Sequence, residues 1–323
     1  MCTAITYKTK DSYFGRNLDL EYSYNESVTV TPRNYRFRFR MANEIISHYA
    51  MIGMAYVVGD YPLYYDAMNE RGLSIAGLNF PDNAVYYEPC GGKDNITPFE
   101  LIPWLLSDCA TISDVKAKLS KINIVNIPFS EKLPLSPLHW IISDKEASIV
   151  VEAMTDGMKI YDNPVGVMTN NPPFDFMLYY LAGFRDLSAD RSENRFCGLE
   201  LPAYCKGLAA MGLPGDYSSA SRFVRASFIK HNSASSDDEL SSVSQFFHIL
   251  SGVEMPRGCV RLGDGMNEIT VYTSCCNQDR GIYYYTTYDN RQISAVDMYR
   301  ENLDGSTLVS YPLIEKQSIF IQN

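Results

Sequence analysis

Short alternating or apolar segments fill the first 90 residues of this sequence, a pattern that favours β-strands. The stretch 27–40 alternates most regularly, and 51–80 consists of apolar runs that break at Gly59-Asp60 and Arg71-Gly72. Two helices are then predicted. One begins at Thr97 as N-cap, followed by Pro98 and by Glu100 at the third helical position, and the other is the amphipathic segment 113–122.

Strands return after these helices, and the pattern then repeats. Strands are predicted at 138–144, 147–154, 157–163 and 165–169, and then helices at 174–184, 218–231 and 237–252. The tail is again predicted as strands, at 268–276, 281–290, 291–299 and 318–322. This order is not the strict strand–helix alternation of a parallel doubly wound sheet. It indicates an α+β fold in which antiparallel sheets pack together and helices cover them.

The sequence contains no internal repeat or low-complexity linker, so we expect a single domain over residues 1–323. One segment, 185–217, is long and irregular. Loops of that length are usually functional or make subunit contacts, so it is predicted to be an assembly loop. No apolar run is long enough to cross a membrane, and no signal peptide is visible, so we expect a cytoplasmic protein.

Charge and ligand patterns exclude several functions. The net charge of −10 argues against nucleic-acid binding, which requires clustered basic residues. The segment "RNYRFRFR" (33–40) is therefore predicted to be an amphipathic strand, with phenylalanines inward and arginines in solvent. Eight cysteines form no CxxC pair, and four histidines lack ligand spacing, so neither a metal nor a cofactor is expected. Most of the cysteines are predicted to be buried thiols.

The chain begins "MCTAITYKTKDSYFGRNLDL", which places a cysteine at the second position. Removal of Met1 would leave Cys2 with a free α-amine beside its thiol, and such an amine can act as the base for its own side chain. The alternating segment "TAITYKT" predicts a strand that fixes this cysteine. A hairpin at Lys10-Asp11 would bring Arg16 within reach, where it favours the thiolate, and Asp19 could orient the site.

The opening motif resembles the choloylglycine hydrolase family, which includes bile salt hydrolases and penicillin V acylases. Further matching motifs follow in order: "NERGLSIAGLNFP" (69–81), "LPLSPLHWIISD" (133–144), "VGVMTNNPPFD" (165–175), "GLPGDYSSASRFVRASF" (212–228), "YTSCCNQDRGIYYYTTYDN" (272–290) and "ENLDGS" (301–306). The resemblance covers nearly the whole chain. It implies the αββα sandwich of N-terminal nucleophile hydrolases, and it implies a homotetramer.

The resemblance also implies roles for individual residues. Cys2 is the nucleophile, and Arg16 and Asp19 tune or orient it. Asn79 donates to the oxyanion through its backbone N–H and Asn170 through its side-chain amide. The remaining implied catalytic residue, Arg222, completes the polar network. Preorganised N–H donors of this kind stabilise the oxyanion that forms when an amide is attacked.

The resemblance is strongest to bile salt hydrolases, because penicillin V acylases commonly carry Tyr at the position of Asn79, and because "LHW" and "ENLDG" match that branch. The implied reaction is hydrolysis of glycine- and taurine-conjugated bile salts through an acyl-enzyme thioester. A steroid needs an apolar trough. Its candidate lining residues are Leu18, Tyr22, Tyr24, Tyr65, Phe129 and Leu133. Positive charge for the amino-acid end is expected from Arg16 or Arg222.

Two alternatives remain open from the sequence. A penicillin V acylase, or an acyl-homoserine-lactone acylase, would use the same nucleophile with a differently shaped trough. A non-catalytic thiol protein that senses oxidation through an exposed cysteine belongs to another class. The absence of a CxxC pair weighs against that second alternative.

Overall fold

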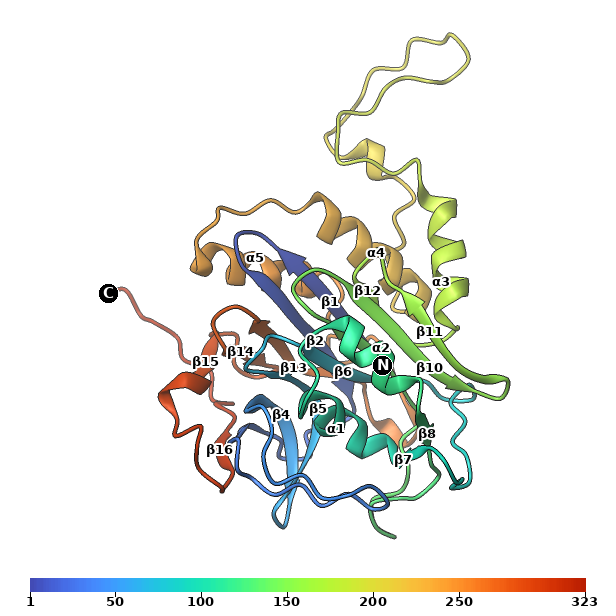
Figure 1. Ribbon diagram of the computed structural model, residues 1–323. Helices are drawn as coiled ribbons and strands as arrows, with labels where there is room; N and C mark the ends of the chain where they lie inside the picture. The colour runs from blue at the N-terminus through green and yellow to red at the C-terminus, as the bar shows by residue number, and fades with distance from the viewer.

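Two antiparallel β-sheets lie face to face at the centre of the computed structural model, which describes residues 1–323 (Figure 1). The first sheet has six strands in the order β12, β1, β2, β13, β14, β15: Val167–Met168, Cys2–Lys8, Ser12–Leu20, Ile269–Asn277, Ile282–Thr287 and Ser294–Asp297. The second has eight, in the order β11, β10, β9, β6, β5, β4, β3, β16: Gly157–Asp162, Ser148–Met154, Leu138–Ser143, Ser74–Asn79, Tyr61–Asn69, Met51–Val58, Ser27–Thr31 and Val309–Pro312. The predicted antiparallel architecture is confirmed.

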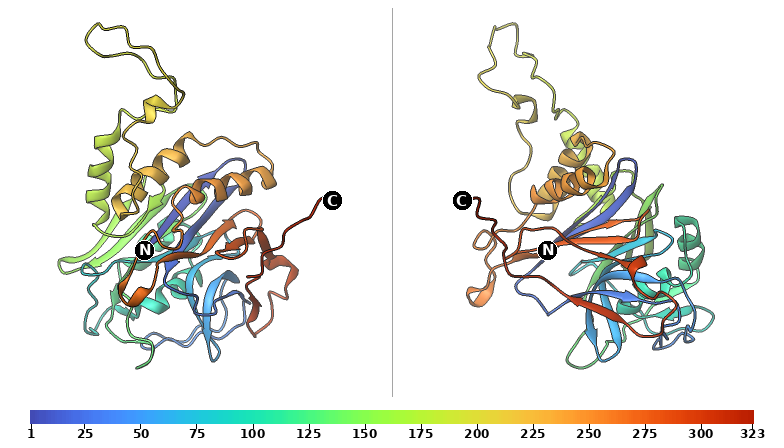
Figure 2. Two further views of the ribbon diagram at one scale, coloured as in Figure 1. Left: turned by 180° about the vertical axis from the view of Figure 1, so that it is seen from behind. Right: turned by 90° about the vertical axis from the view of Figure 1, so that its left-hand side faces the viewer.

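Helices cover the outer faces of this pair of sheets. They are α1 to α5: Leu101–Leu106, Ile112–Leu119, Phe174–Leu181, Ser219–Asn232 and Glu239–Ser251. The last two, α4 and α5, pack on β1, β2, β12 and β13 of the first sheet, whereas α1 packs on β5 and β6 of the second (Figures 1 and 2). A short parallel pair, β7 (Asp94–Ile96) and β8 (Ile122–Ile124), lies beside α2. No helix combines the length and apolar content that crossing a bilayer requires.

Alternation of side chains along the strands produces two hydrophobic cores. On β4, Ile52 and Met54 face the first sheet, and Met51 and Ala55 face α1. The pairing of β4 with β5 shifts register at Met54/Ala55, which leaves Tyr65 as the extra residue. Such a β-bulge puts two consecutive side chains on one face. Tyr65 and Asp66 accordingly both point toward the first sheet.

The helix starts follow the capping residues in the sequence. The Glu100 carboxylate accepts a hydrogen bond from the Thr97 backbone N–H at 3.0 Å, as its spacing predicts. The side chain of Ser218 caps α4, and Asp238 caps α5 by accepting from the Ser241 N–H at 2.9 Å. The α4 helix carries Arg222, one of the predicted catalytic residues.

Two predicted strands are absent. Strand β3 ends at Thr31, directly before Pro32, and 33–40 runs as extended loop with one isolated bridge at Phe37. Proline lacks the N–H that pairing requires. The predicted orientation is nevertheless right, since the aromatic side chains of 33–40 are buried and the arginines after Arg33 are exposed. The tail 318–322 is exposed and unpaired, because no neighbouring strand edge lies beside it.

The segment 185–217 extends away from the two sheets, and only a short 3-10 turn at Leu208–Ala210 interrupts its irregular path (Figures 1 and 2). Several of its large apolar side chains are exposed: Phe196, Leu199, Leu201, Tyr204 and Met211.

The cysteine prediction was wrong for half of the set. Cys90, Cys197, Cys205 and Cys259 are exposed, and the other four are buried.

Candidate active site

The β1–β2 hairpin brings three predicted residues together. Cys2 lies opposite Leu18 and Ala4 lies opposite Arg16 in the antiparallel register. Side chains opposite one another share a face of the sheet, so Cys2, Leu18 and Arg16 all face the second sheet. Asp19 lies one residue further and points to the opposite face, toward α4. The predicted hairpin is thus confirmed, and β1 fixes Cys2 at its first residue.

Arg16 is fully buried beside the thiol. One of its nitrogens, Nη2, donates to Cys2 Sγ, and Nη1 donates to the Gly77 carbonyl and to the Tyr65 carbonyl at 3.3 Å. Burial alone opposes a charge here, but Cys2, Tyr272 and other nearby acidic groups outweigh it and raise the pKa of Arg16. Arg16 therefore stays a cation that faces the sulfur.

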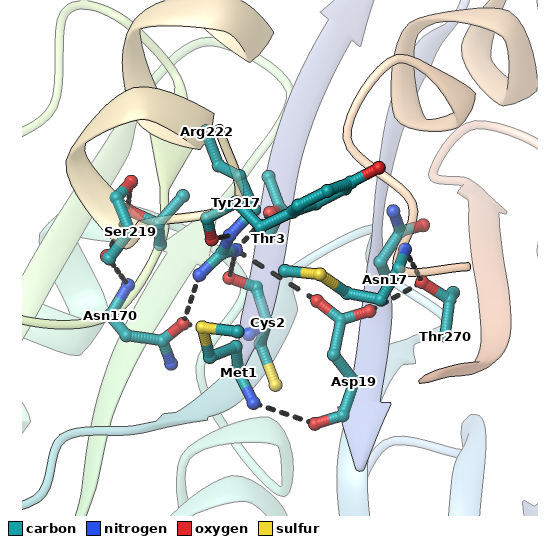
Figure 3. Close-up of polar contacts among 12 residues, drawn as sticks. Met1, Cys2, Thr3, Asn17, Asp19, Asn170, Tyr217, Ser219, Arg222 and Thr270 are labelled. Atoms are coloured by element: carbon teal, nitrogen blue, oxygen red, sulfur yellow. Dashed lines mark hydrogen bonds and ion pairs between the residues drawn. The ribbon is translucent and has the colours of Figure 1, made fainter. Parts of the chain in front are cut away.

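Arg222 and Asp19 form the other side of the site (Figure 3). Arg222 is fully buried and donates to the Cys2 carbonyl, to Thr3 Oγ1 at 2.7 Å and to Asn170 Oδ1 at 2.8 Å. Its Nη1 lies 4.0 Å from Asp19 Oδ2. Burial raises the pKa of Asp19, and Arg222 opposes part of this rise. The buried Arg222 cation thus contacts the Cys2 backbone and the Asn170 side-chain amide, and it lies near the Asp19 carboxylate.

Asn170 joins the nucleophile to the second sheet. Its Oδ1 accepts from the Cys2 backbone N–H at 2.8 Å, and its Nδ2 donates to the Asn79 carbonyl at 2.7 Å. Asn79 is the last residue of β6 and is partly exposed. The structure therefore brings all six predicted catalytic residues into one region, although Asn79 is joined to it through its backbone.

Met1 occupies the remaining space at the end of β1. Its ammonium donates to the Asp19 carbonyl at 2.8 Å (Figure 3), and it forms an ion pair with Glu268. Burial lowers the pKa of this ammonium. Asp19 Oδ1 accepts from Thr270 Oγ1 at 2.6 Å, and Asp19 Oδ2 is buried without a hydrogen-bond partner.

Sequence reasoning missed Thr270 and Glu268. Both lie about 250 residues from the hairpin, and neither has a distinctive motif.

A cavity of about 440 Å³ opens onto Cys2. Fifteen of its 23 lining residues are hydrophobic, which makes it an apolar trough. Five of the six predicted pocket residues line it: Leu18, Tyr24, Tyr65, Phe129 and Leu133. A polar hollow of about 370 Å³ around Lys8 and Lys145 lies elsewhere, and no predicted site residue lines it.

Tyr22 is the exception among the predicted pocket residues. It follows the end of β2 at Leu20, and its side chain is 49 % exposed. It packs on the outer side of Tyr24, with ring centroids 4.9 Å apart, and lines a separate hollow with Glu26. Tyr22 therefore lies outside the wall of this cavity, because it comes after the end of β2.

The cavity wall includes groups that sequence reasoning missed. Phe99 comes from the 3-10 turn (Pro98–Glu100) directly before α1, Ile102 comes from the first turn of α1, and Tyr56 comes from β4. Phe129 is held by Arg40, whose Nη2 donates to the Phe129 carbonyl at 2.6 Å and whose guanidinium lies 5.2 Å from the ring. An exposed arginine of the 33–40 segment therefore orders one wall of the cavity.

The positive charge expected for the substrate is only partly present. Arg16 lines the cavity, but Arg222 does not, because it lies behind Cys2 with its donors directed to protein oxygens. Lys132 is the other cation on the cavity wall, and it is exposed. No cluster of three or more metal-ligating side chains occurs in the structure.

Comparison with known proteins gives full-length matches. The family model of linear amide C–N hydrolases, choloylglycine hydrolase family, matches residues 2–311. A bile salt hydrolase/transferase from Lactiplantibacillus plantarum is 54% identical over 100% of both chains. A second relative with that name, from Clostridium perfringens, is 41% identical over 99% of both.

Solved structures agree with these sequence matches. A variant of conjugated bile acid hydrolase from Clostridium perfringens superposes with a TM-score of 0.93 at 39% identity, covering 100% of both chains. Penicillin V acylase from Agrobacterium tumefaciens gives a TM-score of 0.74 at 22% identity, covering 96% of this chain and 90% of that one. The second likeness shows a shared fold.

Proposed function

The chain belongs to the choloylglycine hydrolase family of linear amide C–N hydrolases, and from this membership we propose that it hydrolyses the amide bond of glycine- and taurine-conjugated bile salts. The observation that carries the proposal is the position of the Cys2 thiol in the wall of a predominantly apolar cavity. A steroid requires such a surface, with few polar groups placed at the reacting bond.

The proposed reaction begins after Met1 has been removed. The Cys2 sulfur attacks the carbonyl carbon of the substrate amide, and the C=O electron pair moves to oxygen. Arg16, which donates to Sγ, stabilises the thiolate. The new α-amine of Cys2 takes the thiol proton. Asn170 Oδ1, at 2.8 Å from the Cys2 nitrogen, holds this amine, and the unpartnered Asp19 Oδ2 is available to accept from it.

Two N–H donors are proposed for the oxyanion. The carbonyls of Gly77 and Asn79 point away from β9, toward Arg16 and Asn170 respectively. In an antiparallel strand the N–H and C=O of one residue point to the same edge, so the Asn79 N–H also faces the site. Asn170 Nδ2 is the second proposed donor. In the substrate-free structure it is bonded to the Asn79 carbonyl, so substrate would have to share or replace that contact.

Collapse of the tetrahedral intermediate breaks the C–N bond. The α-ammonium of Cys2 returns a proton to the departing nitrogen, which leaves as glycine or taurine. The acyl group remains on sulfur as a thioester. Water then attacks the thioester, and free bile acid and thiol are released. Arg222 acts by fixing the Cys2 carbonyl and Asn170 relative to one another.

A second activity is proposed at the same site. Relatives from Lactiplantibacillus plantarum and Clostridium perfringens are named as hydrolase/transferase. The thioester carbonyl lies on a cavity that is open to solvent, so a free amine could attack it in place of water. Transfer would then compete with hydrolysis, and its share would rise with amine concentration.

The experiment is release of glycine and taurine from glycocholate and taurocholate, with penicillin V measured in parallel. Intact mass first establishes that Met1 is absent. Fast bile-salt turnover with weak penicillin V cleavage is the expected result. The reverse ranking would assign the chain to penicillin V acylases. Absence of turnover on both substrates would contradict the proposal.

We also propose that 185–217 is an assembly loop and that the protein forms a homotetramer. The exposed apolar side chains of this segment support this, because such surface is usually covered by a partner. Four exposed cysteines without disulfides support a cytoplasmic location. Deletion of 190–205 should reduce the particle mass measured by light scattering, and an unchanged mass would contradict the assembly role.

A further inference from the structure

His139 and Glu152 form a buried pair that takes no part in the reaction described above. They lie on the neighbouring strands β9 and β10, and both side chains are almost fully buried. The distance from His139 Nδ1 to Glu152 Oε1 is 3.1 Å. Neither residue lines the cavity, so neither can contact substrate there.

This pair holds the segment that carries Asn170 at both of its ends. The other ring nitrogen of His139, Nε2, lies 2.9 Å from the Thr169 carbonyl, directly before Asn170. The Glu152 carboxylate accepts from the Phe174 backbone N–H, with Oε1 at 3.1 Å and Oε2 at 3.3 Å. The polypeptide between these two contacts contains Asn170.

The same histidine also supports the strand end that carries Asn79. The His139 ring stacks on Phe80, with centroids 4.2 Å apart and an interplanar angle of 5°. Phe80 directly follows Asn79, and its N–H donates to the Pro137 carbonyl at 2.8 Å. One imidazole therefore touches the immediate neighbours of both proposed oxyanion donors.

A count of donors and acceptors shows that the hydrogen bonds of the His139–Glu152 pair are difficult to satisfy. Oxygen atoms face both nitrogens of His139, and a neutral imidazole carries only one N–H. The Glu152 carboxylate is engaged as fully, since both of its oxygens also accept from the Phe174 N–H. A buried polar network is rigid when every member is satisfied and costly when one partner is removed. Such a network suits a positioning role.

We propose that His139 and Glu152 are positioning residues that set the distance between the Asn79 and Asn170 donors. This inference rests on the proposed function, because it assumes that these two donors stabilise an oxyanion. A misplacement of about 1 Å in a catalytic group can cost about 100-fold in rate. Loss of His139 should accordingly lower kcat by about 10- to 100-fold, with a smaller change in KM.

The test compares His139→Gln with wild type and with His48→Gln. His48 is a matched control, since it is also buried, also has an oxygen atom facing each ring nitrogen (the Tyr49 and Tyr35 backbone carbonyls) and also packs on a phenylalanine, Phe37, but lies outside the site. Both variants should lose similar unfolding free energy in urea. Only His139→Gln should lose kcat.

Alkylation of Cys2 by iodoacetamide supplies a second measurement, followed by mass spectrometry of the N-terminal peptide. This reaction forms no oxyanion, so its rate should be unchanged in His139→Gln. Unchanged kcat, or a parallel fall of kcat and alkylation, would overturn the proposal. Should His139→Gln fail to fold, Glu152→Gln gives the test. It keeps one acceptor oxygen, and we expect kcat to fall about tenfold.

The two proposals fail in different ways. If wild type turns over neither conjugated bile salt, the function is wrong, and the positioning test then uses the amide that wild type cleaves best. If wild type turns over bile salts but His139→Gln matches it, only the positioning role is wrong.

Discussion

Replacement of Arg16 by methionine should separate its effect on stability from its effect on catalysis. Burial raises the pKa of Asp66, and Arg16 together with the Tyr272 hydroxyl opposes part of this rise. Without Arg16, Asp66 is a buried carboxylate held only by neutral donors. Removing one partner of a buried charge pair typically costs about 3–5 kcal/mol. Arg16 and Asp66 form no direct ion pair, so we expect the free energy of unfolding of Arg16→Met to fall by the lower end of this range.

Arg16→Met should also lose catalytic activity, in addition to this loss of stability. Hydrogen bonds to charged groups contribute about 1.5–3 kcal/mol, so losing the donor at Cys2 Sγ should lower kcat roughly 10- to 150-fold. Adding Asp66→Asn removes the unbalanced carboxylate, so the double variant should regain stability but not activity. The assays are urea unfolding and amino-acid release from the conjugated bile salt.

A matched control is available in Arg33→Met. Arg33 pairs with Glu70 and Asp304, but its side chain is 37% exposed, so its loss should cost less than about 1 kcal/mol and leave kcat unchanged. Additive stability losses for Arg16→Met and Asp66→Asn would refute the charge coupling. Wild-type kcat in Arg16→Met would refute the role at sulfur.

Three further predictions concern the nucleophile, the cavity and pH. Cys2→Ala should abolish turnover while its circular dichroism and urea midpoint stay close to wild type, and measurable hydrolysis would contradict the mechanism. Tyr24→Ala should raise KM several-fold, whereas Tyr22→Ala should not, and equal effects in steady-state assays would contradict the cavity described here. Burial lowers the pKa of Lys230 from 10.5 to about 8, so the unfolded chain binds more protons between these values. The contribution of Lys230 to stability should therefore rise from about pH 8 to about pH 10.5, and the difference in urea midpoint between wild type and Lys230→Met should grow over this range.

The hairpin residues could be predicted from the sequence because their information is local. A strand beginning at Cys2, a turn near Asp11 and period-two alternation place Arg16 on the face of the nucleophile. Asn170 and Arg222 carry no such local signal. Each alone fits a turn or a helix surface, and only the order of motifs in the family resemblance pointed to them.

The other residues of the site could not be predicted from the sequence, because their positions depend on how distant elements pack together. Phe99 reaches the cavity from the 3-10 turn before α1, about 80 residues after the hairpin, and Thr270 reaches Asp19 from the neighbouring strand β13. Tyr22 lies outside the cavity wall because β2 ends at Leu20, and a strand end cannot be located to one residue from sequence. The exposed tail 318–322 has the composition of a strand but no partner edge.

The position of Met1 has a consequence for the order of events during biosynthesis. In the folded chain its ammonium contacts the Asp19 carbonyl and Glu268, and its side chain is only 27% exposed. A protease that removes this residue needs an extended N-terminus, so its work belongs to the period before folding. That period is long, because β13, which pairs with β2, is completed only at Asn277. At about 5–20 residues per second the ribosome needs roughly 15–55 s to reach it. In the proposed mechanism, an aminopeptidase must therefore remove Met1 before β13 is complete and has paired with β2.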